Sequence, residues 1–478
     1  MENSCDILIT NASTIIPLVG KLDTNILIED GKIKAVRKSI ENIQASRVIN
    51  ASKKYVLPGI IDPHVHYGVF TPIDSSAVTE SRSAAVGGIC TIMRMLRMHG
   101  SFKNIWKHLE ASRIKHLVDY QIHASILNNL QLKEMRFLSK LGINSYKLYM
   151  NLGSDMKQIL ADLEPGNYNL DEIEVNMTDK LVFDIVRKAA LLNSLLLVHS
   201  EDHEECSKFM RDNYQIRNAI KNRLLELWSN CRPTSSEVVS IQKVTGMASR
   251  CGTDLYFVHI GSSDALQAIV NCRSIYKNRS FWAETCPHYL THTSEYDNLR
   301  GKVVPPLRSK DDVSTLWNAI SMGLLDTIGT DHVANTLETK IIQDDLWKSR
   351  SGFPGLATML PVLLSEGVNK NRISLEKLSE ICSLNPSRIF GMFPKKGTIQ
   401  CGSDADLTIV DLEKEQIVTP EILQSYSDYT IYEGWNLRGW PVMTIVRGKP
   451  IMENGYVDDQ AIGHGKFVRH EGSQLSTI

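Results

Sequence analysis

The sequence predicts an α/β fold, namely a (β/α)8 TIM-like barrel flanked by a small β-sandwich domain that both ends of the chain build together. Three observations support this prediction. Short β-rich runs alternate with helical patterns through the middle of the chain, further β-type runs occur near both termini, and the first central run ends in a pair of histidines. Strand–helix alternation of this length is typical of a closed parallel barrel.

The two chain ends carry similar β patterns. Near the amino end, residues 26–28 and 33–36 flank the turn Glu29-Asp30-Gly31 as a hairpin. Residues 406–410 and 443–449 have the same strand character near the other end. We therefore predict a discontinuous β domain, a central barrel and a C-terminal tail. Their expected limits are residues 1–55 with 390–460, residues 56–389, and residues 461–478.

The central region contains eight β-rich runs, the number that the barrel requires. Between them, segments such as 179–193 and 236–250 place apolar residues at helical spacing after a polar start. The eight expected barrel strands are residues 56–61, 89–93, 120–125, 145–150, 195–198, 255–260, 281–285 and 327–329.

The composition indicates a protein with a large core and a small-molecule substrate. Of 478 residues, 42% are hydrophobic and 22% are charged, and 53 basic side chains stand against 54 acidic ones. Because there is no basic excess, neither nucleic acid nor an anionic membrane surface is an expected partner.

The sequence also bears on localisation. Residues 1–6 lack the basic region of a signal peptide, and no uncharged apolar run reaches the roughly 18 residues of a membrane-spanning helix. The nine cysteines are scattered and form no CxxC pair, which is typical of reduced thiols. We expect a cytoplasmic protein.

Potential metal ligands occur at the expected carboxyl ends of the barrel strands. His64 and His66 are two residues apart, so a strand presents both rings on one face. Lys147 lies among apolar and aromatic neighbours, where an unpaired ammonium is costly and requires a partner or a modification. Each residue taken alone is more often structural, but their joint occurrence at strand ends favours a metal centre. The candidate ligands are His64, His66, Lys147, His199, His259 and Asp331.

Several motifs outside these ligands are typical of one group of enzymes. They are Pro58-Gly59 before the histidine pair and residues 284–290, 305–308, 326–332, 385–391, 402–407 and 433–435. With these motifs the chain resembles the amidohydrolase superfamily, specifically the cyclic amidohydrolases. That group comprises hydantoinase or dihydropyrimidinase, allantoinase and long-form dihydroorotase. The resemblance covers nearly the whole chain.

The resemblance implies a binuclear metal-dependent hydrolase that opens a cyclic amide ring. In the family, the lysine that matches Lys147 carries a carbamate formed with CO2, which bridges two divalent ions, expected to be Zn²⁺, with manganese or iron left open. One ion is then held by His64, His66, Lys147 and Asp331, and the other by Lys147, His199 and His259. The resemblance further implies attack by a metal-bridging hydroxide, with Asp331 as the catalytic base and then acid. His332, Asp202 and His288 are expected to orient ligands or loops.

The positions that bind substrate in relatives differ in this sequence. Long-form dihydroorotases have an arginine where Gly68 stands, and allantoinases have an asparagine there. Because an arginine pairs with the substrate carboxylate, dihydroorotate is disfavoured unless another cation substitutes. Allantoinase and dihydroorotase activities remain the alternatives to a hydantoinase-like or dihydropyrimidinase-like one.

Hydantoinases have a tyrosine at the position of Leu152, for which Tyr149 is a possible substitute. Val304 and Ser351 occupy further substrate-contacting positions, where relatives have serine or asparagine. Tyr149, Leu152, Val304 and Ser351 are therefore the candidate substrate-binding residues. These departures predict an apolar pocket for a neutral or hydrophobically substituted cyclic amide.

Other interpretations stay open. The insert 151–175 is either a lid over the pocket or passive surface, and residues 344–354 are a second candidate loop. A non-catalytic scaffold related to dihydropyrimidinase would have lost metal ligands, and a mononuclear deaminase would lack the lysine at position 147. The resemblance also implies a homodimer or a homotetramer.

Overall fold

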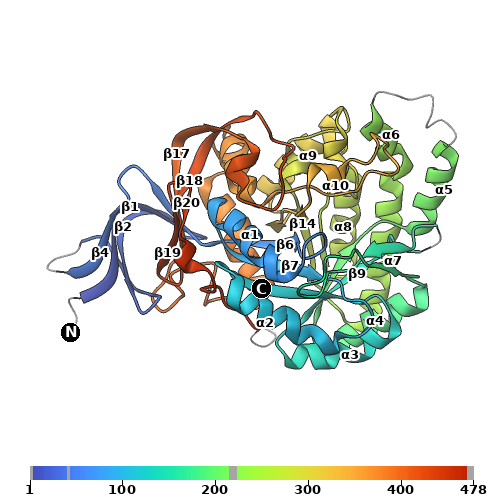
Figure 1. Ribbon diagram of the computed structural model, residues 1–478, viewed down its shortest axis with the longest axis horizontal. Coiled ribbons are helices and arrows are strands. Elements are labelled where there is room, and N and C mark those ends of the chain that lie inside the picture. Colours follow the sequence, from blue (N-terminus) through green and yellow to red (C-terminus); the bar gives the residue numbers. More distant parts are fainter. Residues whose placement is uncertain (1–3, 40–42, 154, 215–222, 471–478) are drawn as a thin grey trace.

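The computed structural model describes residues 4–39, 43–153, 155–214 and 223–470. It contains the two predicted parts, a parallel barrel and a β-sandwich domain built from both chain ends. Figure 1 shows that the first and last strands of the chain lie together at one end of the molecule, whereas helices surround the barrel strands at the other. The prediction of the fold class is confirmed.

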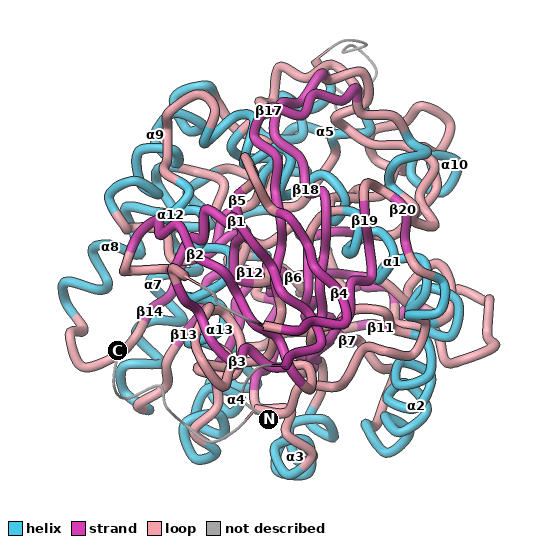
Figure 2. Tube along the Cα trace, turned by 90° about the vertical axis from the view of Figure 1, so that its left-hand side faces the viewer, coloured by secondary structure: helices cyan, strands magenta, loops and turns pink. Residues whose placement is uncertain are grey.

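Strands from the two chain ends pair into one nine-stranded sheet. The parallel partner of β5 is β1 and its antiparallel partner is β17, so β5 joins the amino-terminal half of the sheet to the carboxyl-terminal half. Figure 2 shows strands from both ends side by side. The strands are β1 (Ser4–Ile16), β2 (Gly20–Glu29), β3 (Lys32–Arg37), β4 (Gln44–Asn50), β5 (Tyr55–Pro58), β17 (Leu407–Ile417), β18 (Asn436–Val446), β19 (Lys449–Glu453) and β20 (Tyr456–Val457).

The predicted hairpin near the amino end is present as β2 and β3. Asp30 and Gly31 link the two strands with φ angles of 51° and 72°. A two-residue hairpin favours positive φ at both central positions, which aspartate tolerates and glycine adopts freely.

The predicted first barrel strand, 56–61, is two strands in the structure. β5 ends at Pro58 in the terminal sheet, and β6 (Ile60–His66) begins the barrel. Gly59 lies at the junction, where an added Cβ would come within 2.7 Å of Asp406 Cβ and 2.8 Å of Cys90 Sγ. Only glycine fits this close approach of the two domains, and the apolar run alone did not reveal the break.

The barrel sheet consists of parallel strands and closes on itself. Residues 327–333 provide both β15, which pairs with β14, and β16, which pairs with β6. The eighth predicted strand therefore continues beyond residue 329 to Val333. The barrel strands after β6 are β7 (Ile89–Leu96), β8 (Asp119–Ser125), β9 (Ser145–Tyr149), β12 (Leu195–His199), β13 (Leu255–Phe257), β14 (Phe281–Thr285), β15 (Thr327–Ile328) and β16 (His332–Val333).

Helices follow the barrel strands, and α4 illustrates why they form. Its buried side chains are spaced to lie on one helix face, the Thr178 hydroxyl accepts a hydrogen bond from the Leu181 amide, and Asn193 ends the helix with φ of 49°. The helices are α1 (Ile73–Val86), α2 (Ile105–Lys115), α3 (Asn129–Lys140), α4 (Asp179–Leu192), α5 (His203–Tyr214), α6 (Leu224–Cys231), α7 (Thr234–Cys251), α8 (Ser263–Ile275), α9 (Lys310–Met322), α10 (Leu337–Lys340), α11 (Met359–Val362), α12 (Leu375–Ser379) and α13 (Asn385–Ile389).

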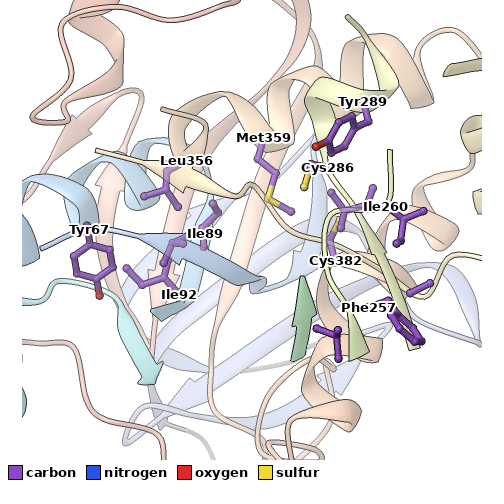
Figure 3. Close-up of a cluster of buried hydrophobic side chains, with 14 of the residues drawn as sticks. Tyr67, Ile89, Ile92, Phe257, Ile260, Cys286, Tyr289, Leu356, Met359 and Cys382 are labelled. Carbon is purple, nitrogen blue, oxygen red and sulfur yellow. The ribbon is translucent and has the colours of Figure 1, made fainter. Parts of the chain in front are cut away.

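The main hydrophobic core fills the space between the barrel strands and their surrounding helices. Figure 3 shows part of it, with Ile89 and Ile92 of β7, Phe257 of β13, and Leu356 and Met359 from the segment around α11. All five side chains are fully buried. None of the described helices combines the length and apolar character that a membrane crossing requires.

The predicted C-terminal tail is described as far as residue 470. It runs beside β8, where the Tyr120 amide donates to Lys466 O at 3.0 Å and the Val468 amide donates to Tyr120 O at 2.8 Å. Residues 471–478, like residues 1–3 of the predicted β domain, lie outside the described residues. The domain limits themselves stay a prediction.

Candidate metal centre

Three potential ligand atoms meet at the carboxyl end of β6. The Nε2 atoms of His64 and His66 are 3.2 Å apart, and Asp331 Oδ1 lies 3.2 Å from each of them. All three side chains are buried. Burial lowers the pKa of both imidazoles well below the usual range, so the rings are neutral and each has a nitrogen lone pair.

A buried carboxylate fixes the tautomer of His64. Glu284 Oε1 lies 2.8 Å from His64 Nδ1, and it also accepts a hydrogen bond from the His259 amide at 3.0 Å. The Tyr256 hydroxyl donates to Glu284 Oε2 at 2.7 Å. Because the Nδ1 proton faces Glu284, the lone pair of His64 is on Nε2, directed at His66 and Asp331.

Asp331 is held beside the histidines through the backbone. The Asp62 carboxylate accepts hydrogen bonds from the Thr330 amide at 3.0 Å, from the Thr330 hydroxyl at 2.6 Å and from the His64 amide at 3.1 Å. Asp331 has φ of 50°, a left-handed conformation that costs energy in residues other than glycine. Asp62 therefore ties the end of the eighth strand to the first.

Lys147 points its amine into the same site. The side chain is fully buried on β9, and its Nζ has no hydrogen-bond partner among the described residues. Burial lowers the pKa of Lys147 to about 7, although the nearby charges of Asp331 and Glu284 oppose this shift. A substantial fraction of the amine is thus neutral near pH 7. A neutral, unpaired amine is the form that can react with CO2.

His199 and His259 complete the set from the next two strands. Their ring centroids are 4.5 Å apart, and that of His259 lies 5.4 Å from that of His64. Glu201 Oε2 lies 2.6 Å from His199 Nε2, which leaves Nδ1 with the free lone pair. His259 has φ of 45°, so a second member of the set has left-handed backbone.

The six candidate ligands fit one or more cations. The structure brings together neutral imidazole nitrogens, a carboxylate oxygen and an unpaired amine that are all deeply buried, an arrangement that is costly without a compensating ion. Nitrogen and oxygen donors of this kind suit Zn²⁺ and related divalent ions.

Sequence reasoning missed the residues that orient these ligands. Glu284 belongs to the motif at residues 284–290, but no function was predicted for it. Glu201 follows His199 by two residues and was not predicted to contact it. Glu201 is itself held by two hydrogen bonds from the Arg232 guanidinium, at 2.8 and 2.7 Å. No sequence spacing relates Arg232 to Glu201, because the two come from different elements.

Three residues that were expected to orient ligands or loops have defined contacts. His332 Nε2 lies 2.9 Å from Glu80 Oε2. The Asp202 carboxylate accepts hydrogen bonds from the Glu204 and Glu205 amides in the first turn of α5. The His288 ring packs edge-on against Phe353, with centroids 5.0 Å apart.

A cavity of about 380 Å³ opens beside the ligands. The structure places all four candidate substrate-binding residues in its wall: Tyr149, Leu152, Val304 and Ser351. The strand β10 (Gln158–Leu160), which pairs with β11 (Glu172–Glu174), lines it as well. The described part of the insert 151–175 thus forms a wall of the cavity; residue 154 lies outside the described residues.

The cavity is less apolar than predicted. Side chains such as Val69 and Ile159 line it, but so do Arg97, Arg232 and Arg350. The arginines come from three separate parts of the chain, so no local pattern indicated that they would meet.

The parallel barrel and the ligand cluster at its strand ends define a class, a barrel hydrolase that uses metal ions. Within that class, the chain belongs to the amidohydrolase family, whose model matches residues 278–451. The L-hydantoinase of Paenarthrobacter aurescens is 31% identical, over 98% of this chain and 99% of that protein. The D-hydantoinase of Ralstonia pickettii is 30% identical, over 97% and 98%.

Solved structures agree with these relatives. The L-hydantoinase (dihydropyrimidinase) from Arthrobacter aurescens superposes with a TM-score of 0.86 at 30% identity, covering 97% of this chain and 100% of the other. A D-hydantoinase from a Bacillus species has a TM-score of 0.86 at 27% identity, covering 98% and 100%.

Proposed function

We propose that this protein hydrolyses the ring amide bond of a small cyclic amide, in the manner of a hydantoinase or dihydropyrimidinase. The observation that carries the proposal is the convergence of His64, His66 and Asp331 with the unpaired amine of Lys147 at the wall of a substrate-sized cavity. Full-length similarity to hydantoinases supports it.

Two divalent ions, expected to be Zn²⁺, would share the six ligands. His64, His66, Lys147 and Asp331 would hold one ion, and Lys147, His199 and His259 the other. When bound, the ions supply Lewis acidity for the ring carbonyl and lower the pKa of water to around 7, which makes a hydroxide available.

Lys147 would serve both ions as a carbamate. Its neutral amine forms an N–C bond with CO2 and releases one proton, which gives an anionic group with two oxygen atoms. The lowered pKa of Lys147 supports this step, because the neutral amine is the nucleophile.

Asp331 would move the proton during ring opening. Its carboxylate takes a proton from the attacking water and delivers it to the ring nitrogen as the carbon–nitrogen bond breaks. One water is consumed, and the product has a free N–H group and a new carboxylic acid, which ionises to a carboxylate and releases one proton. The Asp62–Thr330 hydrogen bonds hold the backbone of this segment still during the transfer.

Two other classes fit the site less well. A mononuclear deaminase has no use for a buried lysine at position 147, and a non-catalytic scaffold would have lost some of the six candidate ligands, all of which the sequence retains. Allantoin and dihydroorotate remain alternative ring substrates. The expected homodimer or homotetramer also remains part of the proposal.

Metal analysis combined with a substrate panel tests the proposal. Protein loaded with Zn²⁺ and bicarbonate should bind two ions per chain and open one of four rings, namely hydantoin, dihydrouracil, allantoin or dihydroorotate. One ion per chain would favour the deaminase, and none the scaffold. Two bound ions with no ring opened would refute the proposed reaction.

A further inference from the structure

The wall of the cavity has more positive charge than its acidic residues can balance. Arg97, Arg232 and Arg350 line it, whereas Asp331 is the one acidic residue among the described lining residues. Arg232 is neutralised by its two hydrogen bonds to Glu201. Arg97 and Arg350 are therefore the two arginines of the cavity wall whose positive charge is not balanced in this way.

Arg97 shares its acidic partner with a second arginine. Arg94 donates to Asp162 Oδ2 at 3.0 Å and 2.6 Å, whereas Arg97 Nε is 3.6 Å from Asp162 Oδ1, beyond hydrogen-bond distance. The Nε atom of Arg97 is buried without a hydrogen-bond partner among the described residues. One carboxylate therefore faces two guanidinium groups, and a net positive charge remains at Arg97.

That charge lies close to the metal ligands. Arg97 follows β7 by one residue, and its side chain is only 11% exposed. Arg97 lines the same cavity as the candidate ligands His66 and Lys147. The Asp162 amide also donates to Arg97 O at 2.7 Å, which fixes the backbone beneath the guanidinium.

Arg350 has no acidic partner within the described residues. Its guanidinium carbon lies 5.5 Å from the centre of the Phe70 ring, and both residues line the cavity. Its Nε atom is likewise buried without a hydrogen-bond partner there. Stacking on an aromatic ring holds a guanidinium in place but leaves its donors available.

The segment that carries Arg350 is fastened on both sides by buried lysines. Lys302 Nζ donates to Leu346 O at 2.7 Å and to Ser349 O at 2.5 Å, and Lys340 Nζ donates to Gly352 O at 2.8 Å. The backbone on either side of Arg350 is therefore held by hydrogen bonds from two buried lysine amines. Such support is what a binding residue on a loop requires.

We propose that this cavity selects a cyclic amide whose ring carries a carboxylate, and that Arg97 and Arg350 bind that carboxylate. The proposal rests on the proposed ring hydrolysis and adds the charge of the substrate. A planar guanidinium with unpaired donors matches a carboxylate better than a neutral amide group, because paired N–H donors meet two anionic oxygens. We therefore expect an anionic substrate in place of the neutral one that the sequence predicted.

Matched pairs of substrates that differ only in charge test the proposal. Hydantoin-5-acetic acid is compared with hydantoin-5-acetamide, and dihydroorotate with its carboxamide, on enzyme with measured metal content. The readout is the ratio of kcat/KM for the acid to that for the amide. We expect the wild-type ratio to exceed about tenfold for at least one ring, and Arg97→Gln or Arg350→Gln to reduce it by roughly 10- to 100-fold, mainly through KM.

Two further variants separate charge recognition from a general loss of function. Arg97→Lys keeps the charge without the planar fork and should keep part of the ratio. Arg136→Gln removes the same charge from an exposed position on α3 and should keep all of it. A wild-type ratio near one, or a ratio that Arg97→Gln leaves unchanged, would overturn the proposal.

Binding measurements distinguish failure of this proposal from failure of the proposed reaction. Affinities for the acid and the amide are measured by calorimetry on the Asp331→Asn variant, which should not turn the ligands over. Tighter binding of the acid that Arg97→Gln abolishes would support the carboxylate site even if no ring were opened by the wild type. Equal binding of acid and amide would overturn it even if both were hydrolysed.

Discussion

The buried amine of Lys147 should make activation of the enzyme depend on pH in a specific way. Burial lowers the pKa of this lysine to about 7. The neutral fraction of the amine then rises from about 10% at pH 6 to about 50% at pH 7 and about 90% at pH 8. An exposed lysine, with a pKa of about 10.4, would be less than about 0.1% neutral at pH 7 and would gain tenfold per unit up to about pH 9.

Because the neutral amine reacts with CO2, the activation rate of metal-free enzyme should follow that fraction. We expect the rate to increase about tenfold from pH 6 to pH 8 and to level off above pH 8. The assay is the time course of activity after addition of Zn²⁺ at a fixed concentration of dissolved CO2, with the pH varied. The concentration of CO2 rather than of bicarbonate is held constant, since their ratio itself changes with pH.

The result that refutes this reasoning is a rate that keeps rising tenfold per unit from pH 7 to pH 9. That result would mean that the metal-free site hydrates the amine and leaves its pKa near the ordinary value. Lys147→Ala is the control, because it should show no CO2-dependent activation at any pH.

Three substitutions test other parts of the site. Lys147→Ala should leave the barrel folded but empty the shared metal position. We expect a metal content below two ions per chain and loss of hydrolysis. Activity at the wild-type metal content would contradict the bridging role. Asp331→Asn should retain much of the metal, since an amide oxygen replaces the carboxylate. Its kcat should fall roughly 10²- to 10⁴-fold because proton transfer is removed. Normal turnover across the pH range would exclude Asp331 as the proton carrier. Glu201→Gln should weaken metal binding by about 10- to 100-fold through misorientation of His199, measured by competition with a chelator, and unchanged affinity would show that Glu201 is dispensable.

The sequence predicted the barrel because its information is local. Each strand and helix is encoded by an apolar pattern with its own polar boundaries, as the cap residues Thr178 and Asn193 of α4 show. The candidate ligands were found for the same reason, since His64 and His66 share one strand, Lys147 lies within β9, and the others lie at or just after a strand end. The order of strands in a closed barrel then brings them together.

The surroundings of the ligands could not be predicted in this way. Glu201 is fastened by Arg232, and Asp62 by Thr330, at sequence separations of 31 and 268 residues. Neither pair leaves a periodic signal, because each depends on how separate strands and loops pack. The break at Gly59 was missed although Pro58-Gly59 is a turn signal, because the residues on both sides of it are apolar and the sequence does not show that they belong to two sheets.

The surroundings of Gly68 show why the absence of an arginine at this position did not predict the charge of the cavity. The absence of arginine there predicted a cavity without a cation for a carboxylate. Gly68 has φ of 93°, and a Cβ at this position would come within 2.5 Å of Arg94 Nη2, which is itself fully buried and paired with Asp162. The guanidinium of Arg94 already occupies the space into which a side chain at position 68 would extend. Since Asp162 is thereby engaged, Arg97 is left with surplus charge at the cavity wall. The packing of Arg94 against Gly68 therefore explains two features together. It leaves no room for a cationic side chain at position 68, and it leaves the charge of Arg97 at the cavity wall without a carboxylate of its own.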